Sequence, residues 1–379
     1  MKTALYCSRQ EKEGLQQVQE GADEEKAGLV LCFAAKSRLN QENWYSVLRK
    51  KFPLAHIVIC STAGEICSTS VLEEAVSVAA LEFGGTTVQA HTVNVADYEN
   101  SFEAGRALMR SFNPYQLQYV LVISDGEQVN GTGLVKGMNA ECGTVLVTGG
   151  LAGDGNHFRS TLVGVNDTAK PGVIAAIGFY GNNIKIGHGS KGGWETFGLE
   201  KSVTRSVVNV LYEIEGKNAL EMYKHYLGTE AAALPWAALL FPLSVVLPDT
   251  NESVVRTILS IDEEAGSMTF AGDIPEGARI RFMRANFDRL TNAAYGAAQQ
   301  SLQTKEAPPQ FALLISCVGR KLVLQSRTEE EVEAVDDVFN HHTALSGFYS
   351  YGELSPLVPG GACQLHNQTM TITTFHEME

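Results

Sequence analysis

A strand, a helix and a second strand between residues 119 and 147 constrain the fold of this chain most. Residues 119–124 form an apolar run that ends at an Asp-Gly pair, which is typical of a buried strand. Leu134 and Met138 then align on one face of a helix, and residues 145–147 form the second apolar run. Two buried strands joined by a helix make a βαβ unit, so the sequence predicts an α/β protein.

Further strands follow this unit without helices between them. Residues 158–165, 172–180, 183–188 and 206–214 are each predicted as strands and alternate as an antiparallel meander would. A meander beside a βαβ unit predicts mixed parallel and antiparallel sheets flanked by helices.

The length of 379 residues favours two or three domains. A turn signal at Glu215-Gly216 separates the meander from a helical pattern, and we place a boundary there. The predicted organisation is an N-terminal segment at 1–26, a first domain at 27–215 and a second domain at 216–379.

The two halves of the sequence echo one another. Leu-Val-Ile-Ser at 121–124 matches Leu-Leu-Ile-Ser at 313–316, and each run is followed by a helix and then by a glycine with an acid. These pairs are Gly153-Asp154 and Gly352-Glu353, and Gly64-Glu65 ends a further strand in the same way. Strand-end turns often use glycine and acids, so chance is one explanation. The other is that the chain contains two related domains.

Residues 148–155 read Thr-Gly-Gly-Leu-Ala-Gly-Asp-Gly and follow the second strand of the βαβ unit. Gly149, Gly150 and Gly153 would allow a ligand or another chain segment to approach the backbone closely. Asp154 adds a carboxylate. The loop is either part of a ligand site or a tight connection between two strands.

Charge and hydropathy exclude several classes of function. The formal net charge of −14, without a basic stripe, argues against binding to nucleic acid or to an anionic membrane. The sequence has no apolar run long enough to span a bilayer and no signal-peptide pattern at its start. The seven cysteines form no Cys-x-x-Cys pair, and several lie in apolar runs. We therefore expect a cytoplasmic protein without disulfides.

Motifs for nucleotide binding and catalysis fit the sequence poorly. Residues 187–192 match Gly-x-Gly-x-x-Gly, but no helix follows them, although a pyrophosphate site needs a helix N-terminus. Gly-Thr-Gly at 131–133 opens a helix but lacks the lysine of a P-loop. Gly-x-Ser-x-Gly and His-Glu-x-x-His do not occur. The sequence therefore predicts a protein that is not an enzyme.

An aromatic cluster occupies residues 347–353. Phe348, Tyr349 and Tyr351 would offer an apolar wall and hydroxyl groups, and Glu353 a carboxylate. Loops at strand ends are where α/β proteins bind ligands, so this cluster predicts a ligand site. The alternative is that the aromatic side chains fill the core.

With these motifs the chain resembles the FIST family of sensory proteins, which carry N- and C-terminal FIST domains. The resemblance spans residues 28–374. The motifs that carry it are the loop at 149–155, Gly-Trp-Glu-Thr-Phe-Gly at 193–198, Gly-Phe-Tyr-Ser-Tyr-Gly-Glu at 347–353 and Cys-Gln-Leu-His-Asn-Gln-Thr at 363–369. It implies a non-catalytic sensor in signal transduction that binds a small ligand. The family acts on histidine kinases, chemoreceptors or cyclic-dinucleotide enzymes, and because no such output is fused here, we expect a separate partner.

Free-standing members of this family include nitric-oxide sensors that bind haem b and regulate a histidine kinase of a two-component system. The resemblance therefore implies haem b as a cofactor, and Cys-x-x-Cys-His is absent, so haem would be held without covalent bonds. Its iron would need an axial histidine. His188 is the first candidate, followed by His366 and His342. Nitric oxide would weaken the axial bond and so change the surface offered to the kinase.

A second hypothesis is a sensor of amino acids or similar small metabolites without haem. In it, the backbone amides of residues 149–155 would bind a carboxylate, and Asp154 or Glu353 an ammonium group. An enzyme of unrecognised type and a structural interaction module are further alternatives. The predicted ligand-binding residues are Gly149, Gly150, Gly153, Asp154, Phe348, Tyr349, Tyr351 and Glu353.

Overall fold

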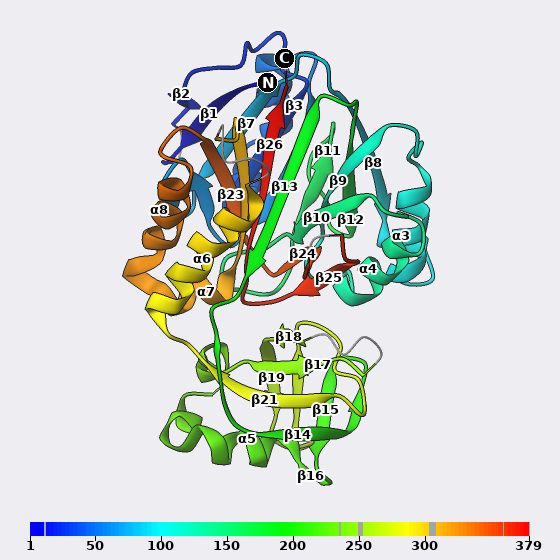
Figure 1. Cartoon of the computed structure of the whole chain (residues 1–379), viewed down its shortest axis with the longest axis vertical. Coiled ribbons are helices and arrows are strands. Elements are labelled where there is room, and N and C mark those ends of the chain that lie inside the picture. The colour runs from blue at the N-terminus through cyan, green and yellow to red at the C-terminus, as the bar shows by residue number, and fades with distance from the viewer. Residues whose placement is uncertain (11–12, 235, 249–252, 303–307, 359, 379) are drawn as a thin grey trace.

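The computed structural model divides into a large upper body and a smaller lower domain (Figure 1). The lower domain comprises residues 195–284, and residues 192–194 and 285–286 join it to the upper body. The structure describes residues 1–10, 13–234, 236–248, 253–302, 308–358 and 360–378.

The upper body consists of three repeats of one chain pattern. Each repeat supplies an outer strand, two parallel strands connected by helix, and a last strand that lies antiparallel to the first of that pair. The first repeat comprises β1 (Lys2–Ser8), β3 (Leu29–Ala35), α1 (Lys36–Gln41), α2 (Trp44–Lys51), β4 (His56–Thr62) and β7 (Val76–Glu82). The second comprises β8 (Thr87–Asn94), α3 (Ser101–Arg110), β9 (Leu117–Ser124), α4 (Gly131–Asn139), β10 (Leu146–Leu151) and β12 (Val173–Tyr180). The third comprises β13 (Ile184–Lys191), α6 (Phe287–Ser301), β22 (Phe311–Cys317), α7 (Val318–Leu324), α8 (Thr328–Val338), β23 (Ala344–Ser350) and β26 (Met370–Glu377).

Each repeat forms most of one six-stranded sheet. The first sheet has the order β11-β4-β3-β7-β1-β2, the second β25-β24-β10-β9-β12-β8 and the third β13-β26-β22-β23-β5-β6. The edge strand β2 (Gln16–Gln19) belongs to the first sheet, and the short helices η1 (Val95–Asp97) and η4 (Gln325–Arg327) lie in connections.

The three sheets exchange strands in a cycle. The strand β5 (Glu65–Cys67) follows β4 of the first sheet but pairs with β23 of the third. Likewise β24 (Gly352–Pro356) follows β23 but pairs with β10 of the second sheet, and β11 (Val163–Val165) follows β10 but pairs with β4 of the first. The strands β6 (Ser70–Leu72) and β25 (Cys363–His366) pair with β5 and β24. Every sheet is therefore completed by a strand from another repeat.

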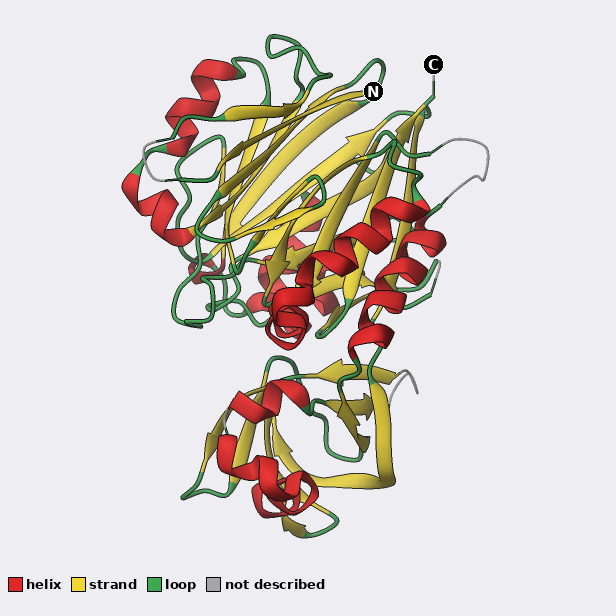
Figure 2. Cartoon of the chain, turned by 90° about the vertical axis from the view of Figure 1, so that its left-hand side faces the viewer, coloured by secondary structure: helices red, strands yellow, loops and turns green. Residues whose placement is uncertain are grey.

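Apolar faces of the three sheets meet in a common core. Phe33 of the first sheet stacks on Phe348 of the third with ring centroids 4.9 Å apart, and Phe179 of the second lies 5.4 Å from Phe375 of the third. Helices cover the outer faces, with α6, α7 and α8 on one side of the upper body and α3 and α4 on another (Figure 1). Figure 2 shows the helices outside the sheets, as expected when each sheet buries one face in the core and the other under helices.

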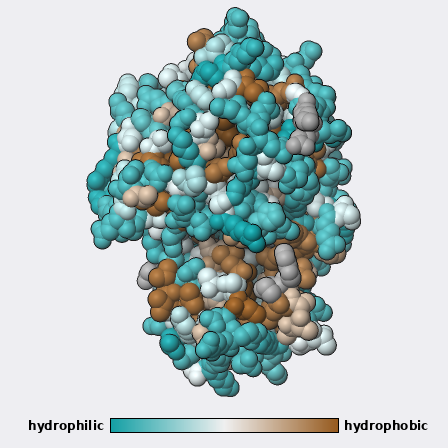
Figure 3. Space-filling model, turned by 180° about the vertical axis from the view of Figure 1, so that it is seen from behind, coloured by the Kyte–Doolittle hydropathy of each residue, from teal (hydrophilic) through white to brown (hydrophobic). Residues whose placement is uncertain are grey.

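The lower domain is a curved sheet with its own core. Its strands pair in the order β18-β17-β21-β14-β15-β20-β19, and its core includes Leu211, Tyr223, Phe270 and Phe282. Seen from behind, apolar residues gather on this domain beneath the upper body, whose surface is largely hydrophilic (Figure 3). The elements are β14 (Glu195–Val207), β15 (Val210–Ile214), β16 (Lys217–Asn218), α5 (Ala219–Leu227), η2 (Gly228–Ala233), η3 (Trp236–Leu240), β17 (Leu243–Val246), β18 (Ser253–Arg256), β19 (Ile258–Asp262), β20 (Ser267–Phe270) and β21 (Arg279–Arg284).

The predicted mixed sheets with flanking helices are confirmed, and β9, α4 and β10 form the predicted βαβ unit. The similarity noted between the two halves of the sequence is part of a threefold repeat, because the first half contains two repeats and the third spans β13 to β26. The expected boundary at Glu215-Gly216 lies in the turn between β15 and β16. The strand predicted at 158–165 is wrong over its first part, since only 163–165 form a strand and the preceding residues form a loop. The amides of Arg159 and Ser160 donate to the carboxylate of Asp154, whereas in a strand they would be available to pair with a neighbouring strand.

Candidate functional site

Three short segments, which we call crossings, carry the chain from one sheet to the next after β4, β10 and β23. They are residues 63–65, 152–154 and 351–353. Backbone hydrogen bonds hold them together: the amide of Ala63 donates to Tyr349 (2.9 Å), that of Gly153 to Ser61 (3.0 Å) and that of Tyr351 to Leu151 (3.1 Å). Each crossing ends in a glycine and an acid, namely Glu65, Asp154 or Glu353, and these acids are 1%, 5% and 0% exposed. The repeats thus bring three buried carboxyl groups to one end of the upper body.

The glycines of the crossings are required by the packing of chain against chain. A Cβ on Gly153 would lie 2.8 Å from the backbone nitrogen of Ala63, and one on Gly352 would lie 2.8 Å from the side chain of Leu365. Gly64 has a φ of +139°, which side-chain-bearing residues rarely adopt. The sequence allowed either a ligand or another chain segment to lie close to this backbone. At Gly153 it is another segment of the protein, at Ala63.

The first and third crossings hold their acids in closed hydrogen-bond networks. Glu353 accepts from the hydroxyl of Ser350 (2.6 Å) and from the amide (3.1 Å) and hydroxyl (2.8 Å) of Thr369. Glu65 accepts from the hydroxyl of Thr62 and from the amide of Ala75 (3.1 Å). Burial raises the pKa of both carboxyl groups to about 8, because the charged form loses its water.

The second crossing differs because its acid lies beside a basic side chain, Lys36, at the cleft. One carboxylate oxygen of Asp154 accepts from the amides of Arg159 (3.2 Å) and Ser160 (3.1 Å), and the other is hydrogen-bonded to the hydroxyl of Tyr351. The Lys36 ammonium lies 3.9 Å from Asp154 and is hydrogen-bonded to the hydroxyl of Ser160. Lys36 directly follows β3, so the strand ends of the first and second sheets place these opposite charges together.

Asp154 and Lys36 line a cleft of about 290 Å³. A second cavity, of about 540 Å³, shares Glu73, Glu74 and His157 with it, so the two form one polar depression. We call this depression the cleft. Its further lining includes Ser37, Asn40, Thr62, Glu65, Asn156, Arg159, Val318, Lys321, Leu322, Gln325, Thr328 and Glu329.

Several of the eight residues predicted to bind a ligand lie close together, since Gly150 pairs with Glu353 and Tyr351 is hydrogen-bonded to Asp154, but of the eight only Asp154 is among the residues that line the cleft. Asp154 lines the cleft, whereas Gly149 and Gly150 lie inside β10, where a Cβ on Gly149 would be 1.7 Å from a carbonyl oxygen. Phe348 and Tyr349 are fully buried, so the core-filling alternative describes these two aromatic side chains.

Backbone amides of the glycine loop are used within the protein. The amide of Ala152 donates to Ser124 (2.7 Å), and that of Gly155 donates to Thr62 (3.0 Å). The amide of Gly153 donates to Ser61, so the bonds of Gly153 and Gly155 hold the crossing against β4 of the first sheet, and that of Ala152 holds it against β9 of the second. Because these three amides already have acceptors within the protein, a ligand carboxylate in the cleft would bind to side chains instead.

Tyr351 fixes the loop that follows Asp154. Its hydroxyl accepts from the amides of Asp154 (3.1 Å) and Phe158 (3.0 Å), and the ring of Phe158 stacks on it at 4.4 Å. Both rings, Phe158 and Tyr351, also line a cavity of about 420 Å³ between the upper body and the lower domain. The loop thus borders the cleft with Asp154 and the domain junction with Phe158.

Sequence reasoning missed the basic residues of the cleft. Lys36, Arg159 and Lys321 come from different repeats, and no local pattern connects them. One usable signal existed for Lys36, which follows a buried strand at its carboxyl end, where α/β proteins bind ligands.

The three histidines considered for haem differ in their surroundings. His342 is exposed, and His366 is buried with its Nε2 hydrogen-bonded to the carbonyl of Ser355 (2.9 Å). His188 bonds through Nε2 to Pro356 (2.9 Å), and its buried Nδ1 has no hydrogen-bond partner in the described part of the chain. It lines a cavity of about 350 Å³ with Ile186 and residues 145–147. Burial lowers the pKa of His188, which favours the neutral ring, and a histidine binds iron through an unprotonated ring nitrogen. Of the three, only His188 combines an available ring nitrogen with a cavity.

The described residues contain no group of three or more His, Cys, Asp or Glu side chains arranged to hold a metal ion. None of their helices is both long and apolar enough to cross a membrane.

Comparison with known proteins identifies the family. No curated protein matches the chain. Among solved structures, a cyanuric acid hydrolase from A. caulinodans is 8% identical over 94% of this chain and 92% of that chain, with a TM-score of 0.36. A chorismatase is 10% identical over 99% of each chain, with a TM-score of 0.37, and scores this low carry no argument about function. The FIST N domain family model matches residues 28–217, and the FIST C domain model matches residues 219–356. The chain therefore belongs to the FIST family of sensory proteins.

Proposed function

We propose that this chain is a non-catalytic sensor that binds a small zwitterionic metabolite, such as an amino acid, in the cleft. The observation that carries the proposal is the pairing of Lys36 and Asp154, which lie 3.9 Å apart at the strand ends and both face the cleft. Family membership supports it, because FIST domains are associated with small-ligand sensing in signalling proteins.

The charges along the cleft suit an amino acid. Its ammonium group would lie beside Asp154, in a cleft that Glu73 and Glu74 also line. Its carboxylate would lie beside Lys36, Arg159 or Lys321, because the amides of the glycine loop already have partners. Charge-assisted hydrogen bonds of this kind are stronger than neutral ones and fix the orientation of the ligand.

Calorimetry with the common L-amino acids tests this proposal. At least one should bind and raise the unfolding temperature, and Asp154→Asn should weaken that binding by about tenfold or more, since a hydrogen bond to a charged group is lost. Glu353→Gln is the matched control, because it changes the equivalent but closed crossing and should leave the affinity unchanged. The proposal fails if none of these amino acids binds, or if Asp154→Asn retains full affinity.

We propose a separate histidine kinase or cyclic-dinucleotide enzyme as the partner that reads the state of the cleft. The association of FIST domains with signalling proteins supports this. The rate of autophosphorylation of a candidate kinase, or of cyclic-dinucleotide turnover, should change when the chain is added and change again with the bound amino acid. Rates that never respond to the chain would remove both partner classes.

A second candidate function, haem-based nitric-oxide sensing, is favoured by one observation: His188 lines a cavity, and its buried Nδ1 has no hydrogen-bond partner among the described residues. Haem b would supply an iron that binds nitric oxide, and His188 would be its axial ligand. Protein purified with ample haem should then show a Soret band that His188→Ala removes and His342→Ala keeps. If no band develops even after hemin is added, this function fails and the amino-acid proposal is unaffected.

A further inference from the structure

The helix α7 lies between the cleft and the connections to the lower domain. It directly follows β22. Val318, Lys321 and Leu322 line the cleft, while Val323 and Leu324 pack in an apolar cluster with Trp194 and Leu290. A single short helix therefore has one side on the candidate ligand site and the other on the junction of the two parts of the molecule.

On the cleft side, Lys321 holds the first crossing. Its ammonium donates to the carbonyl of Ala63 (2.6 Å) and lies 2.5 Å from the carboxylate of Glu73. A Cβ on Gly64 would lie 2.8 Å from the same ammonium. A ligand carboxylate in the cleft would compete with these oxygens for Lys321.

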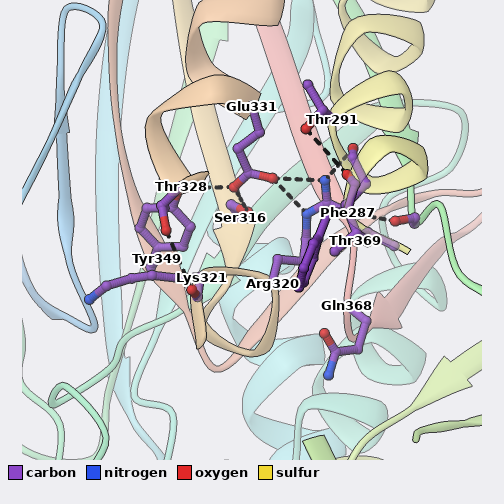
Figure 4. Close-up of polar contacts among 12 residues, drawn as sticks. Phe287, Thr291, Ser316, Arg320, Lys321, Thr328, Glu331, Tyr349, Gln368 and Thr369 are labelled. Carbon is purple, nitrogen blue, oxygen red and sulfur yellow. Dashed lines mark hydrogen bonds and ion pairs between the residues drawn. The ribbon is translucent and has the colours of Figure 1, made fainter. Parts of the chain in front are cut away.

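Arg320, the residue before Lys321, is paired with Glu331 (Figure 4) and is bonded to both segments that lead to the lower domain. Its guanidinium is fully buried and donates to the carbonyl of Gly192, which precedes β14, and to the carbonyl of Leu290 (2.8 Å), in the first turn of α6. One residue thus joins the outgoing and the returning connection.

Glu331 fixes the geometry of Arg320. One of its carboxylate oxygens accepts from the guanidinium at 2.8 and 3.0 Å, and the other accepts from the hydroxyls of Ser316 (2.9 Å) and Tyr349 (2.8 Å). The Tyr349 ring also lies 5.8 Å from the Lys321 ammonium. A buried ion pair contributes little net stability, but it tolerates only one geometry. The contacts of this ion pair therefore link Tyr349, which lies next to Lys321 at the cleft, with Gly192 and Leu290 at the connections.

A second set of contacts runs parallel to the ion pair. The indole of Trp194, in the outgoing connection, donates to the carbonyl of Gln368 (3.0 Å). The amide group of Gln368 donates to Leu239 of the lower domain (3.3 Å), and a Cβ on Gly319 of α7 would lie 2.4 Å from that amide group. A movement of α7 toward Gln368 would therefore displace that side chain.

We propose that α7 couples occupancy of the cleft to the orientation of the lower domain. A ligand carboxylate that takes Lys321 from Ala63 releases the cleft end of α7, and Arg320 passes the shift to both connections. The lower domain then turns relative to the upper body and changes the surface that a partner meets. This inference rests on the proposed function of the cleft. Chains of packed side chains and hydrogen bonds can carry coupling of this kind between two sites, and the contacts of α7 form such a chain.

Hydrogen exchange of the ligand-free protein, followed by mass spectrometry, tests the coupling. Lys321→Met removes the bond to Ala63 and should speed exchange in the connections, residues 190–197 and 284–290, by about fivefold or more, the lower bound of typical coupling. Lys36→Met is the matched control, since Lys36 lies on the other wall of the cleft and does not touch α7. Equal exchange in the two variants would overturn the proposal.

The double variant Arg320→Met/Glu331→Leu gives a second test, because it leaves no buried charge unpaired. Exchange in the connections should rise in this variant, and adding Lys321→Met should have no further effect, since the path is already broken. Additive effects would overturn the proposal, and if the double variant does not fold, the comparison of Lys321→Met with Lys36→Met decides. Neither test uses a ligand, so their failure leaves the proposed function standing, and failure to bind amino acids leaves the coupling measurable.

Discussion

The second and third crossings share one backbone path but differ in their surroundings. Each follows the second parallel strand of its repeat and ends in glycine and an acid. Glu353 is sealed among Ser350 and Thr369, whereas Asp154 borders the cleft and faces Lys36. The same framework therefore provides a structural acid in one repeat and a candidate binding acid in another.

The repeated backbone therefore determines the position of the acid, and the residues around the acid determine whether it can contact a ligand. In the third repeat, residues 367–369 follow the exchanged strands and cover Glu353. In the second, residues of the loop at 155–160 line the cleft together with Asp154 and do not cover this acid. Function lies in the site, as is general for folds that are reused.

Glu353→Ala should have the largest effect on stability. The change leaves the buried groups of Ser350 and Thr369 without an acceptor and opens a cavity, so we expect a loss of about 3 kcal/mol in the free energy of unfolding. Asp154→Ala should cost about 1 kcal/mol, because water can replace the lost acceptor there. Urea unfolding of both variants measures the difference, and equal losses would remove the distinction between closed and open crossings.

Gly153→Ala should be the next most damaging change. Its Cβ would meet the backbone of Ala63 at 2.8 Å, and overpacking against backbone costs about 2 kcal/mol. Gly14→Ala is the control, because nothing lies within 4 Å of the Cβ position there, and its stability should stay within about 0.5 kcal/mol. A tolerated Gly153→Ala would show that the crossings are looser than their geometry implies.

The pH dependence of stability should report the closed acids. Glu65 and Glu353 have pKa values raised from 4.5 to about 8 in the folded protein, so between these values they are protonated when folded and ionised when unfolded. Their stabilising contribution is complete below pH 4.5 and is lost as pH rises to 8, at about 1.4 kcal/mol per pH unit for each group. Urea unfolding from pH 5 to 8 should show this decline, and Glu353→Gln should reduce its slope. An unchanged slope would mean that Glu353 is ionised in the folded protein.

Tyr351→Phe should have the smallest effect. It removes a hydroxyl that holds the Asp154 loop but keeps the ring that stacks on Phe158, so we expect a loss of about 1 kcal/mol or less. Proteolysis within residues 155–160 should become faster while cleavage elsewhere does not. Unchanged cleavage of this loop would show that stacking alone fixes it.

Much of the framework was predictable from sequence, because it depends on local patterns. The apolar runs and the helix of the second repeat were sufficient to predict β9, α4 and β10. Glycine followed by an acid was visible at Glu65, Asp154 and Glu353, and the structure places all three at equivalent points. A sequence read in two halves nevertheless concealed three repeats, since the lower domain interrupts the third between β13 and α6.

The candidate site was less predictable, because it depends on contacts between distant segments. Asp154 was identified from its loop, but Lys36 and Lys321 come from other repeats and only the exchange of strands brings them to the cleft. The burial of Phe348 and Tyr349 depends on the meeting of three sheets, which no single strand pattern reveals. Local patterns predict elements, whereas sites built from several repeats need the assembled molecule.

The cyclic exchange of strands also has a consequence for synthesis of the chain. Glu65 in β5 is paired with Phe348 in β23, which leaves the ribosome about 280 residues later. At typical bacterial and eukaryotic rates of translation, that interval is on the order of tens of seconds, during which β5 has no neighbour on that edge. An unpaired edge invites pairing with other chains. The nascent protein should therefore depend on a chaperone until its last repeat emerges, and a ribosome that stalls before residue 348 would leave an aggregation-prone intermediate.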